Sequence, residues 1–146
     1  MSSEQQFHAW LQQLPESIEI LRNILAEDTG QTLDFSIDSL LMLEQWLLER
    51  YPDLKFIHEN DEYHLMEAAG GYIGETIRQV VGGEWTIELK DEAYAYLGVP
   101  GIGGFKGNRR IPSVYPLTWA TTSLNRRTGE YIRTLAERLI NRVETL

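Results

Sequence analysis

The chain of 146 residues contains no cysteine. This absence excludes a disulfide framework, a thiolate zinc site and a cysteine nucleophile, and it fits a reducing compartment. The N-terminal residues lack the basic segment and apolar core of a signal peptide, and no apolar run approaches the roughly 18 residues of a membrane-spanning helix. These absences predict a cytoplasmic protein.

Basic residues are scarce in the first part of the sequence. Residues 1–67 contain 14 acidic and 3 basic residues, whereas residues 68–146 contain 8 acidic and 10 basic residues, and the whole chain has a net charge of −9. Nucleic acids and anionic membranes need a basic face, so we expect neither as a partner. The acidic part is either a solvated surface or a face that attracts a basic protein. In the second case, Glu59, Asp61 and Glu62 would contact the basic partner.

Apolar residues at helical spacing predict several helices. Pro15 interrupts an apolar stripe in residues 7–25 and predicts two short helices that share one face, with Pro15 in the first turn of the second. The other expected helices are 36–51, capped by Ser36 and ended by Pro52, the long helix 61–81, and 130–143, capped by Thr128. Residues 53–60 are expected to form a connector with a short extended piece at 54–57.

The segment 67–88 is expected to organise the fold, because a helix there passes directly into a strand. Gly82 and Gly83 end the helix, and the alternating pattern around Trp85 indicates a half-buried strand. Gly70 and Gly74 lie on one helix face, where either another element packs closely or a ligand rests on bare backbone. Residues 93–97 are expected to return as the second strand of a β-hairpin.

The pattern after this hairpin is weaker. Residues 98–108 are too rich in glycine for regular structure. Pro112 and Pro116 restrict residues 111–119 to an edge strand or an irregular segment, and residues 118–124 fit either a strand or a short helix. Together the elements predict a single α+β domain over residues 1–146, with several helices packed on one face of a small antiparallel sheet.

The glycine-rich loop Gly98–Gly107 is a candidate ligand site. Its backbone N–H groups, together with Lys106, Arg109 and Arg110, could hold an anion. However, neither a GxGxxG nor a Walker A motif is present. The alternative is a mobile connection whose basic residues pair with the acidic part of the chain.

Two further groups carry candidate chemistry. Asp61, His64 and Glu67 lie along one helix face, and all three side chains can bind metal. Neither a fourth ligand nor an HExxH motif accompanies them. We therefore expect these residues to form a solvated polar face, and we expect no metal and no cofactor. Glu75 is either a general acid or base or the partner of Arg78 in an ion pair on the helix.

One stretch resembles small bacterial domains of unknown function, some of which are encoded beside toxins as immunity proteins. The resemblance rests on Tyr-Ile-Gly-Glu at 72–75 followed by Gly82, Gly83 and Trp85, and it covers about 20 residues. It implies an α+β domain with a role in protein interaction, and it assigns no catalytic residue to this chain.

Two hypotheses for the function follow. The first is a non-enzymatic, cytoplasmic domain that binds a basic protein, with an inhibitor or immunity-type protein as one form of it. The second is a small-ligand or anion-binding protein, or an enzyme, that uses the Gly98–Gly107 loop and Glu75. No recognised catalytic motif supports an enzyme.

Overall fold

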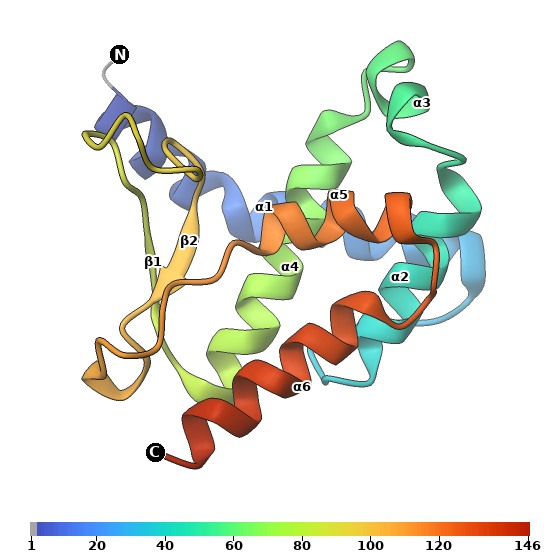
Figure 1. Ribbon diagram of the computed structural model, residues 1–146. Helices are drawn as coiled ribbons and strands as arrows, with labels where there is room; N and C mark the ends of the chain where they lie inside the picture. Colours follow the sequence, from blue (N-terminus) through green and yellow to red (C-terminus); the bar gives the residue numbers. More distant parts are fainter. Residues whose placement is uncertain (1–2) are drawn as a thin grey trace.

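The apolar stripe at the N-terminus forms one helix rather than two. The computed structural model describes residues 3–146, and α1 (Ser3–Thr29) contains Pro15 in its interior. Pro15 cannot donate to the carbonyl of Leu11, and α1 is bent along its length (Figure 1). The prediction of two helices is wrong because one buried face continues across the proline, through Phe7, Leu14, Ile18, Leu21 and Leu25.

Side chains that precede the next two helices accept backbone N–H groups at the helix starts. Ser36 Oγ accepts the backbone N–H of Ser39 at 3.1 Å, at the start of α2 (Ser39–Arg50), and the chain is extended before Pro52 as predicted. Residues 54–57, expected to be extended, belong instead to α3 (Leu54–Glu59). Asp53 caps this helix by accepting the N–H of Phe56 at 2.8 Å, and a cap at this position favours a helical turn.

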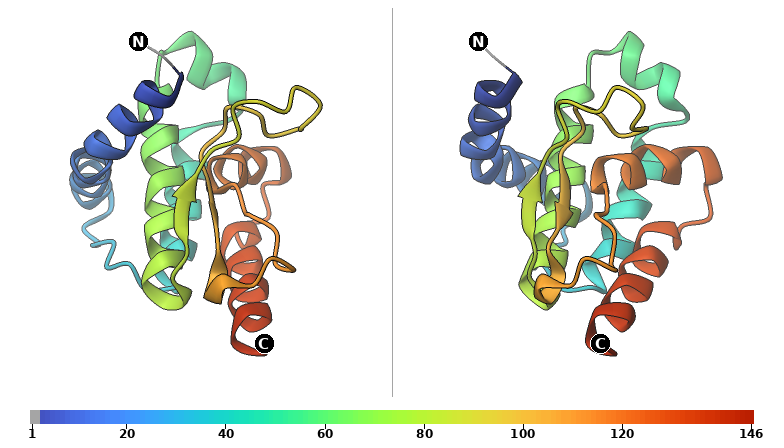
Figure 2. Two further views of the ribbon diagram at one scale, coloured as in Figure 1. Left: turned by 90° about the vertical axis from the view of Figure 1, so that its left-hand side faces the viewer. Right: turned by 60° about the vertical axis from the view of Figure 1, so that its left-hand side comes forward.

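The long helix α4 (Tyr63–Val81) lies at the centre of the fold, with α1 on one side and α5 and α6 on the other (Figure 2). It ends at Gly82, which has a positive φ of 80°. A Cβ at Gly70 would lie 2.7 Å from the Cα of Leu117, and one at Gly74 would lie 2.4 Å from the ring of Trp85. The interpretation of these glycines as sites of close packing is therefore confirmed.

The sheet pairs different segments from those predicted. Strand β1 (Glu84–Thr86) runs antiparallel to β2 (Gly101–Gly103), with Trp85 opposite Ile102. The expected partner, residues 93–97, forms turns, and β2 lies in the glycine-rich segment predicted to be irregular. Glycine is required there because a Cβ at Gly101 would lie 2.6 Å from the ring of Tyr115. A 3₁₀ helix, η1 (Phe105–Gly107), follows β2.

Two helices complete the chain. Residues 116–126 form α5 (Pro116–Arg126), so the expected edge strand or irregular segment is wrong from Pro116 onward. Pro116 occupies the first turn, where its missing N–H is not needed. Helix α6 (Tyr131–Glu144) is present as predicted, but Glu44 rather than Thr128 caps it.

The buried Glu44 joins α2 to the N-terminus of α6. Its side chain is fully buried, and its two carboxylate oxygens accept the N–H groups of Ile132 at 2.8 Å and Tyr131 at 3.2 Å. At the C-terminal end of α2, Arg127 donates to the carbonyls of Leu48, Tyr51 and Pro52. Contacts with the middle of α2, through Glu44, and with its C-terminal end, through Arg127, thus hold the turn between α5 and α6.

The predicted fold class is confirmed. Residues 3–146 contain six α-helices and one two-stranded antiparallel sheet, an α+β arrangement. Most of the buried apolar side chains form one contiguous cluster that draws residues from every α-helix and from β2. In Figure 1 the strand pair stands at one side of the helices, which places Trp85 of β1 against α4.

Candidate functional site

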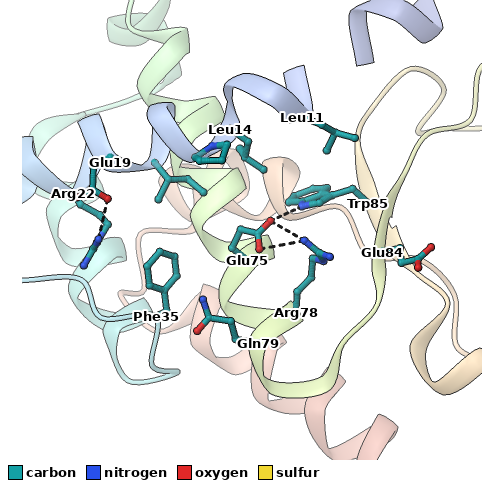
Figure 3. Close-up of a pocket in the computed structure, with 12 residues that line it drawn as sticks. Leu11, Leu14, Glu19, Arg22, Phe35, Glu75, Arg78, Gln79, Glu84 and Trp85 are labelled. Atoms are coloured by element: carbon teal, nitrogen blue, oxygen red, sulfur yellow. Dashed lines mark hydrogen bonds and ion pairs between the residues drawn. The ribbon is translucent and has the colours of Figure 1, made fainter. Parts of the chain in front are cut away.

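A pocket of about 690 Å³ lies between α1, α4 and β1 (Figure 3). Apolar side chains from three parts of the chain line it, namely Leu11, Leu14, Pro15, Ile18, Phe35 and Trp85. Two ion pairs contribute the polar groups, Glu19 with Arg22 on α1 and Glu75 with Arg78 on α4. This volume and this mixture of surfaces are typical of a small-molecule site.

Glu75 is held in place by two donors. Its Oε1 accepts Arg78 Nη1 at 3.0 Å and the indole Nε1 of Trp85 at 2.9 Å, while Arg78 Nε donates to the carbonyl of Gly83 at 3.1 Å. The predicted ion pair with Arg78 is therefore present. Within residues 3–146, the groups bonded to Glu75 only donate, so the structure supplies no partner that could exchange a proton with it.

Phe35 forms the opposite wall of the pocket in an unusual backbone conformation. Its φ is 62°, which is rare for a bulky side chain and costs about 1–3 kcal/mol. The Phe35 N–H donates to the hydroxyl of Tyr72 at 2.8 Å, and the two ring centroids lie 4.8 Å apart. Burial raises the pKa of Tyr72, so this hydroxyl stays neutral.

The second ion pair lies beside Phe35. Arg22 Nη1 donates to Glu19 at 2.9 Å, and Arg22 Nε donates to the carbonyl of Leu33 at 2.8 Å. The guanidinium carbon lies 5.1 Å from the centre of the Phe35 ring, within the range of a cation–π contact. Sequence reasoning found Glu75 but missed Arg22 and Phe35, because no local motif connects them to α4.

The basic residues of the glycine-rich loop do not join this pocket. Lys106, Arg109 and Arg110 are exposed, and none of the three lines the pocket around Glu75. Within the described residues they form no ion pair with the acidic part of the chain. The structure therefore separates the two parts of the hypothesis that joined this loop to Glu75.

The three acids expected to face a partner differ in their environments. Glu59 is exposed and lies 3.6 Å from Lys55, and Asp61 is also exposed. Glu62 is partly buried and accepts two hydrogen bonds from Arg50, both at 3.0 Å, and one from the hydroxyl of Tyr51. Glu62 therefore contributes to the fold and is less free to contact a partner.

The pair of Glu62 and Arg50 predicts a pH dependence of stability. Hydrogen bonds from Arg50 lower the pKa of Glu62 below its usual value of 4.5. Because the lower pKa belongs to the folded state, the pair stabilises the fold above pH 4.5 and loses this effect as the pH falls through the folded pKa. We expect Glu62→Gln to lower the free energy of unfolding by about 1 kcal/mol at pH 7. We also expect the stability of this variant to fall less than that of wild type as the pH is lowered.

Urea unfolding between neutral and acidic pH measures this effect. Glu59→Gln is the matched control, because within residues 3–146 Glu59 forms only an exposed pair with Lys55. Parallel pH profiles for wild type and Glu62→Gln would contradict the role assigned to Glu62.

The row of Asp61, His64 and Glu67 does not assemble a metal site. Within residues 3–146, the structure brings no three histidine or carboxylate side chains into a group that could hold a metal ion. His64 and Glu67 instead line a smaller pocket of about 290 Å³ beside α1.

An ordered loop presents exposed tyrosines. Residues 88–98, named here the tyrosine loop, are closed by a hydrogen bond from Gly98 N–H to the carbonyl of Glu88 at 2.8 Å. Tyr94 and Tyr96 are each 38% exposed, and Leu97 is also exposed. The loop projects from the body of the protein (Figure 2, left). Compact loops with close ends are often functional.

The tyrosine rings are held by Tyr115, which directly precedes α5. The rings of Tyr96 and Tyr115 stack with centroids 4.1 Å apart, and the hydroxyls of Tyr94 and Tyr115 are hydrogen bonded. Burial raises the pKa of Tyr115, so its hydroxyl is neutral. The loop also carries three acids, Glu88, Asp91 and Glu92, against the single basic Lys90. It therefore presents ordered aromatic rings beside negative charge.

Comparison with protein-family models, curated proteins and solved structures finds no match to this chain. Among residues 3–146, no helix is both long and apolar enough to cross a membrane.

Proposed function

We propose that this protein is a non-enzymatic domain that binds a basic protein partner, and that the tyrosine loop is the main contact surface. The single observation that carries this proposal is the exposure of Tyr94, Tyr96 and Leu97 on a loop that Tyr115 already orders. Tyrosine is enriched among the residues that dominate binding energy at interfaces. Rings ordered before binding lose little entropy when a partner docks.

The charge around the loop favours a basic partner. Asp91 and Glu92 are exposed next to the tyrosines, and the whole chain is acidic with a net charge of −9. The negative electrostatic potential of such a surface speeds the encounter with a cationic partner. An arginine of the partner can also stack on a tyrosine ring. The exposed Glu59 and Asp61 add to this negative potential, although the proposed contact with the partner does not require them.

Two further parts of this proposal rest on the sequence. The absence of cysteine fits a cytoplasmic location. The resemblance at 72–85 to immunity-type domains supports the role of an inhibitor whose partner is a toxic protein.

A selection from random displayed peptides tests the proposal. We expect wild-type protein to enrich peptides rich in lysine and arginine, and their association to slow as salt rises. Tyr94→Ser combined with Tyr96→Ser is expected to weaken these peptides at least about tenfold, a loss comparable to one interface hot spot.

Tyr63→Ser is the matched control, because Tyr63 is also an exposed tyrosine, 52% accessible, but lies at the start of α4. Enrichment of acidic or uncharged peptides would contradict a basic partner. Equal binding to wild type and the double variant would remove the tyrosine loop as the contact surface.

A further inference from the structure

The pocket between α1 and α4 is a binding site of a different kind from the tyrosine loop. No residue of 88–98 lines it, and its volume of about 690 Å³ suits a small molecule. Leu14 and Ile18 of α1 supply an apolar wall, with Trp85 and Phe35 adding aromatic surface. Apolar surface of this kind favours a ligand with a large apolar group.

Two ion pairs flank this apolar centre. Figure 3 shows Glu19 and Arg22 at one end, Glu75 and Arg78 at the other, and Phe35 between them. Each arginine is oriented by a second bond to a backbone carbonyl, from Arg22 Nε to Leu33 and from Arg78 Nε to Gly83. The polar groups are thus fixed before any ligand arrives, which lowers the cost of binding.

The guanidinium groups retain donors for a ligand. Within residues 3–146, Nη2 of Arg22 and Nη2 of Arg78 have no hydrogen-bond partner. On Glu75, Oε1 accepts two bonds, whereas Oε2 accepts only one long contact of 3.3 Å from Arg78. The pair of Glu75 and Arg78 therefore offers both a spare donor and a spare acceptor.

An ion pair selects a ligand by the distribution of its charge. A singly charged ligand is attracted by one member of the pair and repelled by the other, so the two effects oppose each other. A zwitterion can place its carboxylate at the arginine and its ammonium at the glutamate, and it gains from both contacts.

Phe35 gives independent support for a ligand at this place. Its φ of 62° is strained, and the bond to Tyr72 holds it there. Strain of this kind persists where the surrounding structure enforces it and is concentrated at ligand clamps. Here it sets the Phe35 ring between the two ion pairs.

We propose that this pocket binds a small zwitterion with a large apolar group, with the charged end at Glu75 and Arg78 and the apolar group against Phe35 and Leu14. Free apolar amino acids and short apolar peptides share this chemistry.

Three probes of matched shape and one dipeptide test the proposal. They are L-phenylalanine, the anion 3-phenylpropionate, the cation 2-phenylethylamine and the dipeptide leucyl-phenylalanine. The indole N–H of Trp85, which donates to Glu75, is the reporter in nitrogen–proton NMR spectra. We expect L-phenylalanine to bind at least about tenfold more tightly than either singly charged probe. If the dipeptide binds more tightly than L-phenylalanine, the ligand of the pocket is a short peptide. The reverse order indicates that the ligand is a free amino acid.

The variant Glu75→Gln tests the charged end directly. It keeps an amide oxygen for Trp85 and removes the negative charge, so L-phenylalanine should lose about tenfold in affinity while 3-phenylpropionate gains. Glu67→Gln is the matched control, because Glu67 is an exposed glutamate on the same helix that does not line this pocket. Gln79→Trp obstructs the pocket from an exposed position and tests the site independently of Glu75.

Three results would overturn the proposal. The first is an unchanged Trp85 signal with all four probes at about 10 mM, a concentration that detects even weak binding. The second is binding of either singly charged probe as tight as that of L-phenylalanine. The third is unaltered binding to Gln79→Trp. Each result leaves the role of the tyrosine loop unaffected, because none of these substitutions lies in residues 88–98.

Discussion

Gly74→Val is expected to lower the free energy of unfolding by about 3 kcal/mol, a large part of the roughly 5–15 kcal/mol that stabilises a typical domain. A Cβ at this position would lie 2.4 Å from the Trp85 ring and 2.8 Å from Ile102 Cδ1. Both neighbours belong to the strand pair, so added carbon atoms would force β1 and β2 away from α4. Urea denaturation followed by circular dichroism measures the loss.

Val80→Ala is the control on the same helix, since Val80 is 43% exposed. It should change stability by no more than about 0.5 kcal/mol. The NMR chemical shift of the Trp85 indole N–H should also change in Gly74→Val, because the Trp85 ring is the group nearest to the added side chain. If Gly74→Val unfolds at the same urea concentration as wild type, the close packing of the strand pair on α4 is wrong.

Glu44→Ala is expected to be destabilising by about 3 kcal/mol, because it leaves the N–H groups of Tyr131 and Ile132 without an acceptor in a buried place. Glu44→Gln retains one acceptor oxygen but loses the negative charge that favours the N-terminus of α6. We expect it to cost about half as much. Thermal and urea unfolding of both variants provide the measurement.

Glu49→Ala is the matched control, because Glu49 is an exposed glutamate on the same helix. Its effect should stay within about 0.5 kcal/mol. Equal stability of Glu44→Ala and Glu49→Ala would show that α6 does not depend on the buried carboxylate.

The sequence predicted the helices where the apolar pattern was long and no proline interrupted it. The helices at 61–81 and 130–143 and the packing role of Gly74 were all expected from spacing alone. Errors arose where tertiary contacts decide the structure. Strand β2 consists of Gly101, Ile102 and Gly103, which pair with Glu84–Thr86 and pack against Tyr115 but give no alternating pattern in the sequence.

The candidate site was predictable only in its local part. Glu75 and Arg78 are three residues apart on one helix, and this spacing was sufficient to predict their ion pair. Arg22 and Phe35 reach the same pocket from positions 53 and 40 residues earlier in the chain than Glu75. No pattern in the sequence signals this meeting, because it depends on how α1 packs on α4.

The bonds of Glu44 and Arg127 also constrain the order in which the chain can fold. Glu44 accepts from residues 87 and 88 positions later, and Arg127 donates to carbonyls 75–79 positions earlier. During synthesis, α2 therefore leaves the ribosome long before its partners at 127–132 exist. Until then, the carboxylate of Glu44 has to remain hydrated, so the surface of α2 that later becomes core stays open to water. Contacts this distant in sequence slow folding, and this stage is when chaperones have most access to the chain.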